Sequence, residues 1–512
     1  MFCLPKQSVE MELAKSYLGL SVSYRAIPFM FYIGEDEMSH NSEEIAVHLF
    51  RVAQGYYIYD MNNNALMKIT ESLYKDVSAF IKNQSTVKSQ SIDKLIDEGY
   101  LRPSKLEKIE HPLTASIKNM IDNCLHMLTL QVTQNCNLRC KYCVYSGSYI
   151  NRRHTNKRMS FETAKKAIDY YIAHSSQSSK YRFGFYGGEP TLEIELIKQC
   201  VEYIKNNVFG KPIEFNITTN ATLLNKDVLD FLVKHRFYLT ISLDGSKEIQ
   251  DKNRIYAANG EGTFDNVMEK IEWIKEDYPN FLNNVRFNMV IDPEDGYKKS
   301  NDFFMYDEKV KDIFVTAGEK NDNNLQKKIK VHPDYYRNKS YEEFKAIAAY
   351  FRGHKEKVSP LVSTYLVSLK KNVADELKVD GSDFKISHPG GPCVPGLQRL
   401  FVNADGKFYP CERVNESSSV MCIGDVEHGI DIEKAKVLLN VGQISESHCK
   451  KCWAFRFCNS CAAYAEDGDV LSAQKRLIRC ESIRNSVERS FMSYCVLKDL
   501  KMDFEELEEN DR

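Results

Sequence analysis

Strand-like and helix-like segments alternate from about residue 128 to residue 380, and this alternation is the feature that most constrains the fold. It is typical of a parallel sheet or barrel. Between the first two expected strands, apolar side chains recur at helical spacing after the candidate N-cap Ser160. Residues 292 to 380 should hold the last helix and strand plus an insertion. The expected earlier strands are Leu128 to Thr133, Arg182 to Tyr186, Ile213 to Thr218, Tyr238 to Leu243 and Val285 to Ile291.

Polar and glycine-rich motifs follow four of these strands at the point where each strand ends. TQNCNLRCKYC follows the first strand, YGGEP the second, TTNAT the third and SLDGS the fourth. In parallel barrels the active site is built at the carboxyl-terminal rim of the strands. The sequence therefore predicts a single site that is assembled from these four motifs.

The first motif contains Cys136, Cys140 and Cys143, with three and two residues between them. Thiolates are soft ligands suited to iron-sulfur clusters and zinc, and structural zinc normally needs a fourth nearby ligand. No fourth ligand is evident, because the nearest histidine, His154, lies in the basic run NRRHTNKR. Three cysteines on a cubic [4Fe-4S] cluster instead leave one iron without a protein ligand, which suits a cluster that binds something else.

The four motifs together resemble those of the radical S-adenosylmethionine (SAM) superfamily, whose CX3CX2C motif follows the first strand of a partial (β/α)6 TIM-like barrel. The resemblance implies an α/β domain over residues 120–380, with a [4Fe-4S] cluster and SAM as cofactors and a 5'-deoxyadenosyl radical as the reactive species. Glycines would let the backbone approach the ligand, and Glu189 would face the methionine ammonium. Ordinary turn chemistry is the alternative for each residue taken singly. The implied SAM-binding residues are Gly187, Gly188, Glu189, Thr219, Asn220, Ser242, Asp244 and Arg254.

Seven further cysteines form a second patterned group, which resembles the SPASM domain, an auxiliary iron-sulfur domain expected here over residues 388–495. The resemblance implies two auxiliary [4Fe-4S] clusters, three clusters in all. One of the two implied ligand sets has three cysteines instead of four, and Cys422 is a candidate for its fourth ligand. The final CX2C pair departs from the usual spacing of three, and a pair of zinc sites is the alternative. The two implied ligand sets are Cys449, Cys452, Cys458 and Cys480, and Cys393, Cys411 and Cys461.

An open corner on an auxiliary cluster invites a peptide thiolate, which resembles thioether-forming maturases of sactipeptides and ranthipeptides. The alternative is an anaerobic sulfatase maturase that oxidises Cys or Ser to formylglycine. In those enzymes an aspartate at the place of Glu412 resembles a general base, so Glu412 is a candidate base. Its alternative role is an ion pair with Arg399 or Arg413. A non-catalytic iron-sulfur electron-transfer protein would explain the clusters but not GGEP, SLDG and the barrel.

Residues 1–105 are expected to form a winged-helix-like module. HLFRVAQGYYIYDMNNNALMKIT reads as strands separated by turns, and two helices follow, the second ending at Gly99. The unit resembles the leader-recognising element of enzymes that modify ribosomally made peptides, in which the leader adds a strand to a sheet edge. The implied partner is a precursor peptide with its leader, and a structural cap on the barrel is the alternative.

Composition limits the other partners. The 512 residues have a formal net charge of -2, so charge gives no reason to expect binding to nucleic acid or to a membrane. The start MFCLPKQSVEMELAK lacks the pattern of a secretory signal, and no apolar run approaches the roughly 18 residues of a membrane span. We expect a cytoplasmic enzyme, whose reduced thiols are ligands rather than parts of a secreted disulfide scaffold. An electron donor such as flavodoxin or ferredoxin would serve it, and residues 496–512 should be a charged, solvated tail.

Overall fold

The centre of the molecule is a ten-stranded sheet with strand order β10-β9-β8-β7-β6-β5-β12-β13-β14-β15. Its first six strands are parallel, and they include the five predicted strands and the sixth expected after residue 292. These are β5 (Leu128–Thr133), β6 (Tyr181–Gly187), β7 (Ile213–Thr219), β8 (Tyr238–Ser242), β9 (Val285–Ile291) and β10 (Val315–Glu319). The computed structural model describes residues 45–83, 89–145, 154–320, 325, 327, 329–353, 358–381, 384–389 and 393–507.

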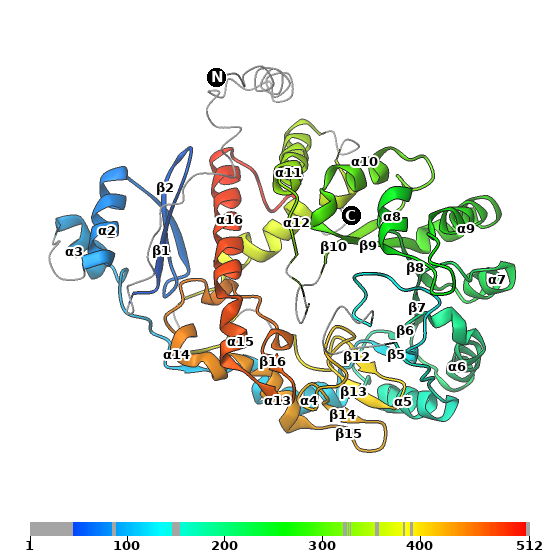
Figure 1. Cartoon of the computed structure of the whole chain (residues 1–512). Helices are drawn as coiled ribbons and strands as arrows, with labels where there is room; N and C mark the ends of the chain where they lie inside the picture. The colour runs from blue at the N-terminus through cyan, green and yellow to red at the C-terminus, as the bar shows by residue number, and fades with distance from the viewer. Residues whose placement is uncertain are drawn as a thin grey trace.

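Helices connect the parallel strands and cover one face of the sheet (Figure 1). Because side chains alternate across a strand, Leu128, Leu130 and Val132 of β5 all point into the apolar core under these helices. The Ser160 hydroxyl accepts a hydrogen bond from Thr163 N, so the predicted N-cap is confirmed. The connecting helices are α5 (Phe161–Ala173), α6 (Ile194–Asn207), α7 (Lys226–Lys234), α8 (Lys247–Asn253), α9 (Phe264–Asp277) and α10 (Lys298–Tyr306).

The face of the sheet turned away from these helices is polar and partly open. On β7, Asn216 and Thr218 alternate with the buried Phe215 and Ile217 and keep part of their surface exposed. Strands β8 and β9 show the same alternation of buried and partly exposed side chains. This face therefore gives a polar ligand access to the carboxyl ends of the strands.

The cysteine-rich region continues the same sheet. Strand β12 (Leu400–Val402) pairs in parallel with β5, and three short antiparallel strands follow it outward. The region after residue 393 is thus joined to the first parallel strand by a hydrogen-bond ladder. The added elements are β13 (Lys407–Tyr409), β14 (Gly424–Asp425), β15 (Gly429–Ile430), α13 (Ile432–Leu439), α14 (Glu446–Cys449), β16 (Glu466–Asp467), β17 (Val470–Leu471), α15 (Ala473–Ile478) and α16 (Cys480–Asp499).

An antiparallel sheet of three strands, β1 (Val47–Val52), β2 (Gly55–Asp60) and β3 (Ala65–Ile69), lies at the amino-terminal end of the described chain. Helices α2 (Glu71–Asn83) and α3 (Gln90–Asp97) follow, in the predicted order of strands and then helices. Gly99 has a φ of +90°, as expected of a residue that ends a helix in the left-handed region. Helices and sheet share a small core formed by Leu49, Ile58, Val77, Ile92 and Leu101.

The opposite face of this small sheet packs against the carboxyl-terminal helix α16, which lies beside it in Figure 1. Phe50 and Tyr59 join Trp453 and Phe491 in one buried cluster. The His48 ring stacks on Trp453 with 3.8 Å between ring centroids. The expected separate unit of residues 1–105, described here from residue 45, therefore shares its core with the cysteine-rich region because both faces of its sheet are apolar.

The expectation of a solvated tail from residue 496 is wrong for residues 496–507. Helix α16 continues to Asp499, and Leu497, Met502, Phe504 and Leu507 are all buried in the cluster of Trp453 and Phe491. These apolar side chains lie between the charged ones, so the segment can pack while its charges face water. Residues 508–512 lie outside the described part.

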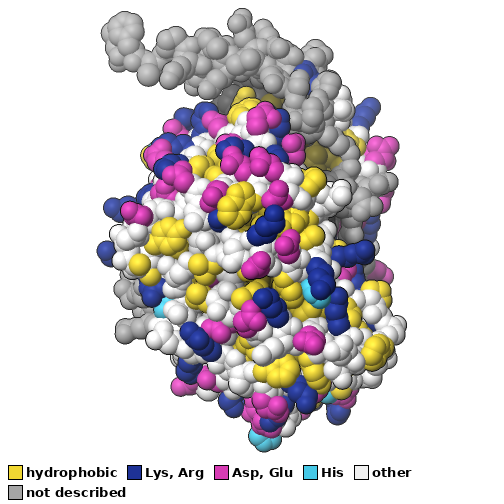
Figure 2. Space-filling model, turned by 90° about the vertical axis from the view of Figure 1, so that its right-hand side faces the viewer, with side chains coloured by type: hydrophobic (Ala, Val, Ile, Leu, Met, Phe, Trp, Pro, Cys, Tyr) yellow, Lys and Arg dark blue, Asp and Glu magenta, His cyan; other side chains and the backbone are white. Residues whose placement is uncertain are grey.

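The remaining helices and strands connect these parts. No described helix combines the length and the apolar character needed to span a bilayer. On the side of the molecule where α6, α7 and α9 lie in Figure 1, acidic and basic side chains are interspersed (Figure 2). The connecting elements are β4 (Lys108–Ile109), α4 (Ile117–Asn123), α11 (Tyr335–Arg352), α12 (Tyr365–Leu369) and β11 (Ile386–Ser387).

Replacing Phe491 with Ala tests the shared core. Its buried ring lies 4.9 Å from that of Tyr59 and 4.8 Å from that of Phe457, so truncation leaves a cavity between the two parts. We expect the free energy of unfolding to fall by about 3–5 kcal/mol in urea denaturation. Phe209→Ala, at a residue that is 74% exposed, should change it by less than about 0.5 kcal/mol. Equal effects of the two changes would contradict the shared core.

Candidate functional site

The ends of β5 and β6 are held together by two backbone hydrogen bonds. Gly188 N donates to the Thr133 carbonyl oxygen and Glu189 N donates to that of Asn135, both at 2.9 Å. A Cβ atom on Gly187 would lie 2.1 Å from the Thr133 oxygen, and one on Gly188 would lie 2.1 Å from the Asn135 oxygen. These glycines are therefore required by the approach of two backbones, whereas the sequence suggested an approach to a ligand.

The Glu189 carboxylate is buried and held by residues of the neighbouring strand ends. Its Oε1 accepts hydrogen bonds from Thr191 N at 3.0 Å, from Thr191 Oγ1 at 2.6 Å and from Thr219 Oγ1 at 2.6 Å. Its Oε2 accepts one from Asn220 N at 2.7 Å. Burial raises the pKa of Glu189 above its ordinary value, and these hydrogen bonds oppose that shift. Glu189, Thr219 and Asn220 thus form one unit at the rim.

The three cysteines of the first motif lie close enough to influence one another's pKa. Burial raises the pKa of Cys136 to about 12, and the nearby Glu189, Cys140 and Cys143 contribute to this increase. Leu138 N donates to Cys136 Sγ at 3.3 Å, and Asn220 Nδ2 lies 3.9 Å from the same sulfur. Cys140 is buried, and Cys136 and Cys143 are partly buried. Shielded thiols with an N–H group directed at sulfur suit an iron-sulfur cluster, whose ligands become thiolates on binding.

Asp244 and Arg254 form a buried ion pair beside the cysteine loop. Arg254 Nε donates to Asp244 Oδ2 at 3.0 Å, and Arg254 Nη2 donates to Oδ1 at 3.3 Å. The Tyr142 hydroxyl also donates to Asp244 Oδ2, and Arg254 Nη1 lies 4.0 Å from Cys140 Sγ. Ser242 is buried at the end of β8. The structure brings Asp244 and Arg254 close to Cys140 but directs them toward each other.

The downstream cysteines fall into two groups. Burial raises the pKa of Cys411 to about 11, and Cys461 and Cys393 are close enough to raise it further. Cys393 is exposed, while the other two thiols are partly buried. In the second group, burial and the nearby Cys449 and Cys480 raise the pKa of Cys458. Burial, Cys458 and Cys449 likewise raise the pKa of Cys452.

The other candidate residues have contacts within the protein. Among the described residues, no group of three or more His, Cys, Asp and Glu side chains is arranged to hold one metal ion. Cys422 places its Sγ 3.4 Å from the Gly424 carbonyl oxygen. Glu412 is paired with Arg399, as its alternative role required.

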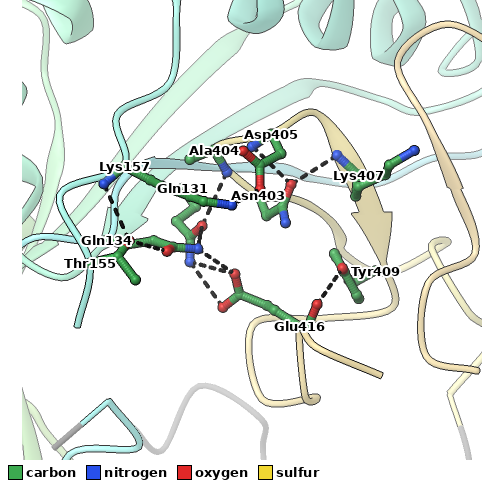
Figure 3. A network of polar contacts seen from close by, with 10 residues as sticks. All are labelled: Gln131, Gln134, Thr155, Lys157, Asn403, Ala404, Asp405, Lys407, Tyr409 and Glu416. Carbon is green, nitrogen blue, oxygen red and sulfur yellow. Dashed lines mark hydrogen bonds and ion pairs between the residues drawn. The ribbon is translucent and has the colours of Figure 1, made fainter. Parts of the chain in front are cut away.

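Sequence reasoning missed a set of polar residues on the face of β5 opposite its apolar side chains. Gln131 and Gln134 both contact Glu416, a carboxylate that follows Cys411 by five residues (Figure 3). The Tyr145 hydroxyl donates to the same carboxylate. The available signal for Gln131 was a polar side chain within the strand-like run LTLQVT, and the structure buries it completely. Glu416 has no signal in the sequence, because its partners are about 280 residues away.

Comparison with known proteins assigns the class of this domain. Residues 130–306 match the model of the Radical SAM superfamily, and these residues form a radical SAM domain. Such a domain implies SAM and a [4Fe-4S] cluster, which the triad and its buried surroundings fit.

The chain is also similar to particular proteins. It is 27% identical over 385 residues to a cysteine-type anaerobic sulfatase-maturating enzyme of Clostridium novyi, covering 72% of this chain and 95% of that protein. It is 38% identical over 148 residues to an uncharacterized protein of Methanocaldococcus jannaschii, of which it spans only 48%. Its fold matches native anSMEcpe with bound AdoMet and Cp18Cys peptide, with a TM-score of 0.53, 21% identity, and coverage of 73% of this chain and 99% of that chain.

Substituting Gly188 with Ala tests the backbone contact at the rim. The new Cβ would push the Asn135 carbonyl away and displace the adjacent Cys136. We expect the reconstituted variant to lose the iron of the triad and SAM cleavage, measured by iron analysis and by 5'-deoxyadenosine release. Gly318→Ala on β10 is the matched control, because no atom lies within 4 Å of its Cβ position. Normal cleavage by Gly188→Ala would show that the contact is dispensable.

Proposed function

We propose that this radical SAM enzyme modifies a ribosomally made, cysteine-containing peptide and installs a thioether cross-link. The observation that carries the proposal is the group of Cys393, Cys411 and Cys461, which offers three thiols and has one exposed member. A cluster held by three protein thiols has a corner for one more soft ligand, and a peptide thiolate is suited to it. The proposal also assigns residues 388–495 to an auxiliary iron-sulfur domain.

The rim residues have a common role in this proposal. The triad would hold a [4Fe-4S] cluster that, with SAM, supplies the 5'-deoxyadenosyl radical. Glu189 remains fixed by Thr191 and Thr219, so its carboxylate is oriented in advance for a cationic group. The Asp244–Arg254 pair lies beside Cys140 and brings a buried positive charge next to that thiol. Contact of these residues with SAM is part of the proposal.

Formylglycine formation is the second candidate. It is favoured by the similarity to the Clostridium novyi enzyme, which extends over 95% of that protein. In both reactions a substrate side chain must lose a proton, and Glu412, whose Oε1 is ion-paired with Arg399, is the candidate acceptor.

We further propose that the amino-terminal sheet binds a leader peptide along β3. In the described residues, β3 pairs only with β2, which leaves its other edge for strand addition. A shallow pocket on α2 is lined by Tyr74, Lys75, Ser78, Ala79 and Lys82. Lys82 and Lys75, which also pairs with Glu71, place positive charge there, and this favours an acidic leader.

The reaction is tested with reduced, reconstituted protein, SAM and a synthetic peptide that combines an acidic leader with a cysteine-containing core. A thioether removes two hydrogen atoms and keeps the sulfur, whereas formylglycine formation from Cys removes the sulfur, so mass spectrometry separates the two. A variant with Ala at Cys136, Cys140 and Cys143 should release no 5'-deoxyadenosine yet retain about eight auxiliary irons. Failure of the unmodified protein to release 5'-deoxyadenosine above a cluster-free control would refute the enzyme proposal, and sulfur loss would favour the second candidate.

Leader binding is tested by reversing charge in the α2 pocket. Lys75→Glu with Lys82→Glu should weaken binding of the fluorescently labelled peptide about tenfold, because two attractions become repulsions. Uncoupled SAM cleavage should not change, since the pocket is distant in sequence and fold from the triad. Lys434→Glu, on the exposed side of α13, is the control. Unchanged affinity would count against this mode of recognition. Point changes are preferable to deleting residues 1–105, because deletion would expose the core shared with Phe491.

A further inference from the structure

Two segments that carry cysteines meet at one partly buried carboxylate. Glu416 lies in the loop after Cys411, and its partners lie on β5 and in the loop that contains the triad (Figure 3). Gln134 precedes Cys136 by two residues, and Tyr145 follows Cys143 by two. Glu416 therefore contacts the triad loop on both sides of its three cysteines.

The hydrogen bonds determine how each group is oriented. Gln131 Oε1 accepts from Ala404 N and from Gln134 Nε2, each at 3.1 Å. Because a backbone N–H can only donate, the amide oxygen of Gln131 must face Ala404, and its Nε2 must face Glu416. Gln131 Nε2 lies 2.9 Å from both Glu416 oxygens and 2.8 Å from the Tyr145 hydroxyl. The network is self-consistent when Glu416 accepts from every neighbour as a carboxylate.

The remaining contacts complete the link between the two segments. Gln134 Nε2 donates to Glu416 Oε2 at 3.2 Å, and the Tyr145 hydroxyl donates to Oε1. Tyr409, two residues before Cys411, donates its hydroxyl to the Glu416 carbonyl oxygen at 2.7 Å. Thr155 Oγ1 donates to Gln134 Oε1 at 2.6 Å, which ties the far end of the triad loop to the same network.

A second contact joins the same segments on the outside. Lys157 Nζ pairs with Asp405 Oδ2 at 2.5 Å, and both side chains are about half exposed. Exposed pairs of this kind contribute little, whereas hydrogen bonds to a partly buried carboxylate are charge-assisted and stronger. Of these two contacts, the one made by Glu416 is the one able to hold the triad loop in place.

We propose that Glu416 is a positioning residue that transmits the position of the Cys411 segment to the SAM-binding loop. Movement of residues 409–416, when the neighbouring cysteine group or its substrate is bound, is passed through Gln131, Gln134 and Tyr145 to residues 133–145. The inference rests on the proposed function only in taking the triad loop as the SAM-binding loop.

Hydrogen–deuterium exchange of the purified protein without peptide tests the proposal. Glu416→Gln replaces an acceptor with an NH2 group that faces the donors, so amides of residues 128–145 should exchange about tenfold faster, the factor expected for one lost charge-assisted hydrogen bond. Asp405→Asn removes the exposed contact between the same segments and should leave their exchange unchanged. Equal acceleration in both variants, or none in Glu416→Gln, would overturn the proposal.

A second variant guards against general unfolding. Tyr145→Phe removes one donor to Glu416, should accelerate exchange in the same peptides, and should add little when combined with Glu416→Gln. Acceleration spread over the whole chain, or full additivity in the double variant, would overturn the inference. In reconstituted protein, both single variants should also weaken SAM binding, measured by the SAM-induced change in the electron paramagnetic resonance signal. These measurements need no peptide product, so they remain decisive if the proposed reaction is wrong.

Discussion

The close approach of two backbones, at the end of β6 and after β5, is the contact on which the site depends. Gly187 and Gly188 allow carbonyl oxygens of the cysteine loop to lie where any Cβ would clash. The two hydrogen bonds formed there fix the start of the loop before its first cysteine. Glu189 follows directly and accepts hydrogen bonds from Thr219 and Asn220 at the end of β7. The order of the parallel strands therefore determines which side chains meet in the site.

The charged groups around the triad are buried, so each needs a partner within the protein. Two carboxylates, Glu189 and Asp244, lie almost without exposed surface on either side of the thiols, and each is compensated differently. Glu189 relies on neutral donors, whereas Asp244 pairs with Arg254 and also accepts from Tyr142. A buried charge needs such compensation, and removing one partner would leave the other uncompensated. These contacts therefore orient both carboxylates within the protein.

The three parts of the chain are not independent bodies joined by linkers. Strand β12 extends the central sheet into the cysteine-rich region, and α16 returns to pack on the amino-terminal sheet. Trp453, which follows Cys452 directly, stacks on His48 of β1. Within the described residues, the amino-terminal sheet, α16 and the cysteine-rich region therefore share packed side chains.

Local patterns predicted the strands, the N-cap at Ser160 and the helix end at Gly99 because these depend on residues near one another in sequence. The motif order also determined that Cys136, Glu189, Asn220 and Asp244 would meet, since parallel strands place their ends at one edge. Only the tertiary structure decided that Gly188 serves a backbone contact, that Phe504 is buried, and that Glu416 joins the triad loop. These outcomes depend on pairs of residues separated by tens to hundreds of positions, and the free energy of such contacts leaves no local period in the sequence.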